Sequence, residues 1–152
     1  ELKVCIEKIL RALEKVYAAK SMQVTCRLDS DVFFLGDERD LMEVLGNVLD
    51  NAFKYGSHAL LITASVNRTP VPQLSIKIED DGPGIAQDHQ EFVLQRGVRL
   101  DTLAQGQGIG LAVVTDIMSS YGGQIAVVDS ALGGTCVELV FSNFQALDSS
   151  ET

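Results

Sequence analysis

An acidic, glycine-rich turn follows a short apolar run in the middle of the chain. The run from Leu74 to Ile78 alternates apolar and polar residues, which predicts a strand, and Glu79-Asp80-Asp81-Gly82-Pro83-Gly84-Ile85 comes directly after it. Gly82 and Gly84 allow close approaches of the backbone, and the proline between them stiffens the turn. Asp80 at a strand end could therefore offer one polar anchor to a flat ligand. The alternative is an ordinary acidic turn, because Asp, Gly and Pro are common in turns.

Two asparagines lie four residues apart in a segment that is predicted to be helical. Asn47 and Asn51 would share one helix face, one turn apart, although Asn is mildly unfavourable inside a helix. Their amide oxygens could face Mg²⁺ bound to phosphates, because Mg²⁺ takes few ligands from protein and prefers oxygen. Lys54 could reach the same phosphates as a point charge, and Tyr55 could cover a base ring. The alternatives are a polar helix face with amide–backbone hydrogen bonds, and packing of Tyr55 at the helix end.

The third feature is a glycine-rich segment, Gly106-Gln107-Gly108-Ile109-Gly110-Leu111. This segment opens a helix that is predicted from Ile109. Free backbone N–H groups at a helix N-terminus form an anion site together with the helix dipole, and glycines let phosphates come close. Dinucleotide-binding folds use similar segments, but no strand leads into this one and no βαβ unit surrounds it. The segment therefore predicts a phosphate site, to which Gln107 could add an oxygen ligand for the metal.

The composition fits one globular domain whose cysteines are in the reduced, thiol form. The 152 residues carry a net charge of −9, which argues against binding a nucleic-acid backbone and means that an anionic nucleotide needs a local positive pocket or a metal. Cys5, Cys26 and Cys136 have no zinc-type spacing, and we expect buried, reduced thiols in a cytosolic protein. We find neither a membrane span nor a signal peptide in these residues, although a longer parent protein could be anchored to a membrane.

Hydrophobic periodicity places these motifs on a mixed set of helices and strands. We expect helices over residues 2–20, 38–55, 88–94 and 109–121, and strands over residues 22–28, 32–35, 59–66, 74–79, 124–128 and 135–141. Asp37 is the expected N-cap of the second helix, and Gly122-Gly123 is expected to end the last one. Residues from about 94 to 107 have no usable period and are expected to form a mobile lid. The predicted domain spans residues 1–142, and residues 143–152 are expected to be a frayed tail.

Three motifs in this order, NVLDNA-x-KYG, EDDGPGI and GQGIGLAV, resemble those of the ATPase family that groups gyrase, Hsp90, histidine kinases and MutL. The resemblance covers nearly the whole chain, and within the family the sequence is most similar to the catalytic domain of a bacterial sensor histidine kinase. It implies an α/β (α+β) two-layer sandwich of the Bergerat type. In that fold, a mixed, mostly antiparallel sheet packs on three helices and carries a flexible ATP lid.

The resemblance also implies roles for individual residues. Asn51, beside Asn47, would bind Mg²⁺, and Asp80 would accept a hydrogen bond from the adenine amine. Thr135, after Gly134, would lie near the adenine, and Arg99 in the lid would neutralise the γ-phosphate unless it is simply solvated. The expected catalytic set is Asn47, Asn51, Lys54 and Arg99, and the expected metal ligands are Asn51, Asn47 and Gln107. The expected nucleotide contacts are Asn51, Lys54, Tyr55, Asp80, Gly82, Gly84, Ile85, Arg99, Gln107, Gly108, Ile109, Gly110, Leu111 and Thr135.

The resemblance favours phosphoryl transfer over hydrolysis. Hydrolytic relatives carry a general-base Glu one turn before the metal-binding Asn, where this chain has Asn47, and an amide cannot accept a proton at neutral pH. His58 and His89 lie outside any helical hairpin, so the acceptor histidine is expected on a separate dimerisation domain of a homodimeric, membrane-anchored sensor that acts on a response regulator. This catalytic domain alone is expected to be a cytoplasmic monomer. The alternatives are an ATP-driven switch or hydrolase of the same fold, a regulatory serine kinase of the anti-sigma type, and a nucleotide-binding module.

Overall fold

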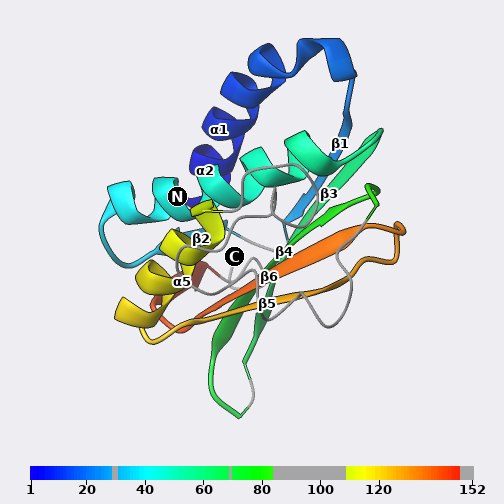
Figure 1. Cartoon of the computed structure of the whole chain (residues 1–152). Helices are drawn as coiled ribbons and strands as arrows, with labels where there is room; N and C mark the ends of the chain where they lie inside the picture. The colour runs from blue at the N-terminus through cyan, green and yellow to red at the C-terminus, as the bar shows by residue number, and fades with distance from the viewer. Residues whose placement is uncertain (29–30, 69, 84–108, 148–152) are drawn as a thin grey trace.

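A five-stranded mixed sheet forms the frame of the protein (Figure 1). The computed structural model describes residues 1–28, 31–68, 70–83 and 109–147. The strand order is β1 (Gln23–Leu28), β3 (Ala59–Asn67), β4 (Gln73–Asp80), β6 (Thr135–Phe141) and β5 (Gln124–Asp129). β1 runs parallel to β3, and every other pair in this sheet is antiparallel. The predicted mixed, mostly antiparallel sheet is therefore confirmed.

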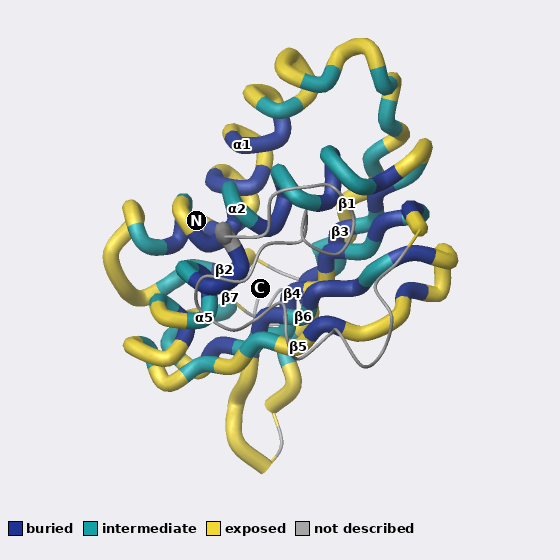
Figure 2. The backbone as a smooth tube through the Cα atoms, in the orientation of Figure 1, coloured by how far each residue is buried: buried dark blue, intermediate teal, exposed yellow. Residues whose placement is uncertain are grey.

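One face of this sheet is covered by helices, as alternation along β4 shows. Leu74, Ile76, Ile78 and Asp80 are buried, whereas the residues between them are intermediate or exposed (Figure 2). Because side chains alternate between the two faces of a strand, Asp80 points to the same helix-covered side as the apolar residues before it. The alternation along β4 thus places the Asp80 carboxylate at the edge of the hydrophobic core.

Three helices are described, and they pack against each other and the sheet: α1 (Leu2–Val16), α2 (Glu38–Tyr55) and α5 (Ile109–Ser120). α2 has the predicted bounds, and its predicted N-cap is confirmed because the Asp37 carboxylate accepts the Arg39 N–H at 2.8 Å. The prediction for the first helix is too long by one turn. After Val16 the chain tightens into a 3₁₀ turn, η1 (Ala18–Lys20), and Ser21 follows it with a φ of 50°.

Two predictions about the periphery are wrong. The expected frayed tail contains β7 (Phe144–Leu147), which pairs antiparallel with β2 (Asp31–Phe34) in a second, two-stranded sheet. β7 forms because β2 offers its free backbone groups from a distant part of the chain, which local periodicity does not reveal. The prediction of three buried thiols fails at Cys26, which is exposed because β1 is an edge strand. The helix expected over residues 88–94 and the lid lie outside the described residues.

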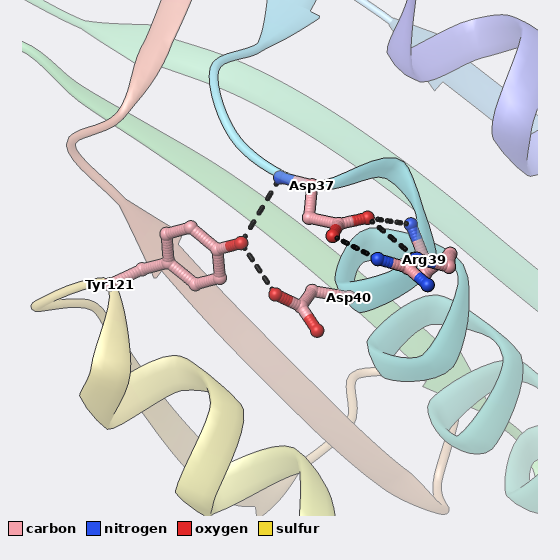
Figure 3. A network of polar contacts seen from close by, with 4 residues as sticks. All are labelled: Asp37, Arg39, Asp40 and Tyr121. Atoms are coloured by element: carbon pink, nitrogen blue, oxygen red, sulfur yellow. Dashed lines mark hydrogen bonds and ion pairs between the residues drawn. The ribbon is translucent and has the colours of Figure 1, made fainter.

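A tyrosine hydroxyl links the end of α5 to the beginning of α2 (Figure 3). Gly122, with a φ of 68°, turns the chain after α5 as predicted, and Tyr121 lies in this turn. Its hydroxyl donates to Asp40 at 2.6 Å and accepts the Asp37 N–H at 3.1 Å. The hydrogen bond to Asp40 raises the pKa of Tyr121. One hydroxyl therefore holds two helices that come from distant parts of the sequence.

We expect Tyr121→Phe to lower the free energy of unfolding, because the Asp37 N–H and the Asp40 carboxylate lose a partner. Urea denaturation followed by circular dichroism would measure the loss. The ring centroids of Phe34 and Tyr121 lie 5.3 Å apart, and Phe34 would keep this aromatic neighbour in the variant. An unchanged denaturation midpoint would show that water replaces the hydroxyl without cost.

Across the described residues, no helix combines the length and apolar character needed to cross a membrane.

Candidate functional site

Asp80 is a buried carboxylate at the end of β4, and its position is fixed by backbone donors. Only 6% of the residue is exposed. Its Oδ1 accepts the Gly82 N–H at 2.9 Å and the Thr135 N–H at 3.3 Å. The two donors come from the turn after β4 and from the first residue of β6. The predicted anchor is therefore held between two strands, with a fixed orientation.

Two glycines leave the backbone close to this carboxylate. A Cβ at Gly134 would lie 2.5 Å from the backbone oxygen of Asp80 and from the Gly82 nitrogen, and would also collide with Asp80 Oδ1. A Cβ at Gly82 would collide with the backbone carbonyl group of Tyr55, whose carbon would lie 2.9 Å away. These positions have no room for a side chain, so the predicted requirement for glycine at Gly82 has a steric cause.

The charge of Asp80 is set by opposing effects. Burial raises the pKa of the Asp80 carboxyl above its ordinary value, and the two N–H donors lower it in part. The neighbouring Asp81 raises the pKa further, whereas Lys20 lowers it. A carboxylate in this situation gains from a hydrogen-bond donor on a ligand, since that donor compensates the cost of desolvation.

The two asparagines of α2 differ in their surroundings. Asn47 Nδ2 donates to the carbonyl of Glu43 at 2.8 Å, so the amide–backbone alternative holds for its nitrogen, and this bond does not use Oδ1. Asn51 is partly buried, and its Nδ2 is buried without a hydrogen-bond partner among the described residues. A buried amide without a partner is rare in folded proteins, and it is expected where a bound group or water completes the contacts.

The end of α2 brings two further predicted residues to the same edge of the sheet. Lys54 Nζ lies 5.7 Å from the centre of the Tyr55 ring, and both side chains are partly buried. The backbone carbonyl of Tyr55 lies against Gly82. Asn51, Lys54 and Tyr55 therefore belong to the half of α2 that reaches Asp80.

The glycine-rich segment is described only from the beginning of α5. α5 begins at Ile109 as predicted, with Gly110 in its first turn. Leu111 is 1% exposed and belongs to the hydrophobic core, so its side chain packs the beginning of α5 against the rest of the domain. The remaining predicted contacts lie outside the described residues: Gly84, Ile85, Arg99, Gln107 and Gly108.

The structure adds a role for Asp81, the carboxylate that follows Asp80. Its Oδ1 accepts the backbone N–H groups of Ser57 and His58, each at 2.9 Å, and 19% of its side chain is exposed. Burial alone would raise the pKa of Asp81, but the backbone donors outweigh it and lower the pKa. Asp81 thus ties the turn after β4 to the segment after α2. His58 itself is exposed.

Sequence reasoning missed Lys20. Its ammonium donates to the carbonyls of Phe53, Lys54 and Gly56, at 2.7, 2.7 and 2.9 Å. These groups are the unpaired acceptors of the C-terminus of α2, which a lysine can satisfy. No motif surrounds Lys20, and the partners are more than thirty residues away, so the sequence held no signal for this contact.

The donor set of this region fits a nucleotide with a divalent cation. It offers a buried acceptor at Asp80, amide oxygens at Asn47 and Asn51, and the positive charge of Lys54. Amide oxygens are suitable ligands for Mg²⁺ when phosphates and water complete the shell. Among the described residues, no group of three or more His, Cys, Asp or Glu could hold a metal by itself. A metal held by Asn47 and Asn51 would need phosphate and water oxygens to complete its ligands.

Comparison with known proteins agrees with this geometry. A family model described as histidine kinase-, DNA gyrase B- and HSP90-like ATPase matches residues 36–144. The virulence sensor histidine kinase PhoQ of Salmonella typhimurium strain LT2 is 43% identical over 136 residues, which cover 90% of this chain and 27% of PhoQ. The chain thus spans about a quarter of the length of the curated relatives that it matches.

Solved structures show the same fold. The mycobacterial sensor histidine kinase MprB superposes with a TM-score of 0.78 at 23% identity, over 95% of each chain. Full-length ShkA, solved in complex with AMPPNP, gives a TM-score of 0.79 at 23% identity over 98% of this chain and 31% of ShkA. The predicted two-layer fold is confirmed. Because the family model covers most of the chain and a relative is 43% identical to it, this chain belongs to the histidine kinase-, DNA gyrase B- and HSP90-like ATPase family.

Proposed function

We propose that this chain binds ATP with Mg²⁺ and donates the γ-phosphate to a histidine on a separate phosphoacceptor domain. The observation that carries the proposal is Asp80, a buried carboxylate whose Oδ1 is fixed by two backbone N–H groups. Family membership supports ATP as the ligand, and the relation to sensor histidine kinases supports the acceptor.

Asp80 provides selectivity in this proposal. Oδ1 is already engaged by the backbone, so Oδ2 accepts the hydrogen bond of the adenine amine. Guanine carries a carbonyl at the corresponding ring position and would place two acceptors face to face in a buried site, which is costly. Tyr55 covers the base, and the Thr135 hydroxyl contacts water beside it.

The other residues hold the phosphates and the metal. Asn51 and Asn47, with Gln107, supply oxygen ligands to Mg²⁺, and Lys54 and Arg99 neutralise the phosphates. Bound Mg²⁺ would reduce the charge that develops on the transferred group. The segment Gly108-Ile109-Gly110 at the N-terminus of α5 donates backbone N–H groups to the phosphates. Gly84 and Ile85, which follow Gly82 in the sequence, also contact the nucleotide in this proposal.

Transfer rather than hydrolysis follows from Asn47. Its amide donates to the Glu43 carbonyl and cannot remove a proton from water, so catalysis depends on positioning and charge neutralisation. The acceptor histidine therefore supplies the nucleophile. In the parent protein we place it on a dimerisation domain of a homodimeric, membrane-anchored sensor, with a response regulator as the final acceptor and this domain in the cytoplasm.

Calorimetric titration tests the binding step. The chain is titrated with a non-hydrolysable ATP analogue, with and without Mg²⁺, and with the corresponding GTP analogue. We expect binding that strengthens with Mg²⁺ and strongly favours adenine. Absence of binding to the folded chain would remove the nucleotide proposal.

A transfer assay tests the acceptor. The chain is incubated with radiolabelled ATP and either an isolated histidine-bearing helical hairpin from a PhoQ relative or a serine-bearing anti-sigma antagonist. Acid-labile, base-stable label on the hairpin is the expected result, because phosphohistidine is hydrolysed by acid. Acid-stable label on the serine partner would favour the regulatory serine kinase.

A further inference from the structure

The last turn of α2 is held by a single ammonium group from η1, the short turn that follows α1. Lys20, in η1, contacts three carbonyls of residues 53, 54 and 56 within 2.9 Å. A tetrahedral ammonium has three N–H donors, so all of them are used. Lys20 thus serves as the C-terminal cap of α2, with both hydrogen bonds and favourable charge toward the helix dipole.

This same turn forms the surface on which Asp80 and Gly82 pack. The three carbonyls that Lys20 contacts do not include that of Tyr55, which lies against Gly82. A Cβ at Gly56 would lie 3.3 Å from the Cβ of Asp80, so the backbone of Gly56 is close to the carboxylate. Displacement of the helix end by a few tenths of an ångström would therefore move Asp80 or Gly82.

From this arrangement we infer that Lys20 is a positioning residue of the nucleotide site, which holds the C-terminal turn of α2 against Asp80 and Gly82. The inference rests on the proposed function for its effect on ATP, but not for its effect on Asp80. Lys20 itself touches no proposed ligand group. It acts through the turn that carries Lys54 and Tyr55.

The charges around Asp80 support this role and provide a readout independent of ATP. Asp81 lies beside it in the chain and Cys136 lies near it on β6, while Lys20 is the cation among the groups that affect its pKa. Lys20 lowers the pKa of Asp80, against the effects of burial and Asp81. Removal of the ammonium would also leave the negative end of the α2 dipole with Lys54 as the cation of its last turn, and therefore less compensated near the carboxylate.

The test compares Lys20→Met with Lys15→Met. Lys15 is exposed in the last turn of α1, so its replacement removes an equal charge without removing a described contact. The Asp80 carboxyl is titrated by ¹³C NMR, and affinity for a non-hydrolysable ATP analogue is measured by calorimetry. In Lys20→Met we expect the Asp80 pKa to rise and ATP affinity to fall by about 3- to 30-fold, the range that a partly buried helix-terminal cation can supply. Lys15→Met should match the wild type in both.

A second variant guards against loss of the fold. Lys20→Gln keeps two N–H donors and loses the charge, and it should change both readouts in the same direction. A normal Asp80 titration and normal affinity in either folded variant would overturn the inference, and so would unfolding of both, because Lys20 would then be a general stability residue. If the wild type binds no nucleotide while the Asp80 pKa still rises in Lys20→Met, the proposed function fails and only the electrostatic effect of Lys20 on Asp80 stands.

Discussion

Replacement of Asp80 by asparagine is expected to weaken ATP binding by about 10- to 150-fold, the range that corresponds to one hydrogen bond to a charged group. Asparagine can still accept the N–H groups of Gly82 and Thr135 through its oxygen. Its amide nitrogen would then face the adenine amine, so that two donors meet in a buried site. The substitution is nearly isosteric, and the effect should therefore be on recognition rather than on shape.

Calorimetry with a non-hydrolysable ATP analogue measures this loss, and Asp81→Asn is the matched control. Asp81 is the adjacent carboxylate, but it accepts the backbone N–H groups of Ser57 and His58. Asp81→Asn should lower the melting temperature and leave affinity within about threefold of the wild type, since its oxygen contacts are structural. Equal losses of affinity in both variants would contradict the assignment of Asp80 as the adenine anchor.

For Asp80→Asn, the pKa of the Asp80 carboxyl also predicts the sign of the change in stability. Burial raises the pKa of Asp80 in the folded protein above that of the unfolded chain, whose carboxyl titrates near about 3.9. At pH 7 the ionised group therefore reduces the free energy of unfolding, and this reduction disappears as the pH falls below both values. Asp80→Asn should melt at the same temperature as the wild type or higher at pH 7, with a smaller difference at pH 4. A lower melting temperature at pH 7 would contradict this sign.

Most of the fold could be predicted because its elements carry local signals. α2 has an N-cap at Asp37, an uninterrupted apolar stripe and a glycine at its end, and the structure reproduces its bounds. The alternation in β4 even indicates which face Asp80 shares. β7 could not be predicted in this way, since Phe144–Leu147 becomes a strand only through its partner β2, more than a hundred residues earlier.

The residues of the candidate site also differ in whether the local sequence carries a signal for them. Asp80 and the α2 asparagines could be singled out from motifs in the sequence, and their contacts with a ligand stay a prediction. Lys20 and the hydroxyl of Tyr121 could not be singled out, because each contacts backbone or carboxylate groups of α2 that are close only after folding. The role of Asp81 was missed for the same reason, because its backbone partners Ser57 and His58 lie more than twenty residues earlier. Residues that connect distant segments leave weaker sequence signals than residues that belong to a motif.

Gly134→Ala is expected to reduce the free energy of unfolding by about 1–3 kcal/mol and to weaken ATP binding more than tenfold. The new methyl group would lie 2.5 Å from the Gly82 nitrogen and would collide with Asp80 Oδ1. The structure can relieve this only by moving β6 away from the end of β4, which breaks the hydrogen bond from the Thr135 N–H to Asp80. One methyl group would thus disturb both backbone donors that fix the anchor.

The neighbouring glycine separates this contact from general damage to the hairpin. Gly133 has a φ of 101°, and a Cβ there would meet no atom within 4 Å. Gly133→Ala therefore costs only backbone strain, about 1–2 kcal/mol, without a new atom near Asp80. Urea denaturation and calorimetry on both variants should give similar losses of stability but a loss of ATP affinity in Gly134→Ala alone. If both variants lose affinity equally, binding depends on the shape of the β5–β6 turn, and the steric role assigned to Gly134 is wrong.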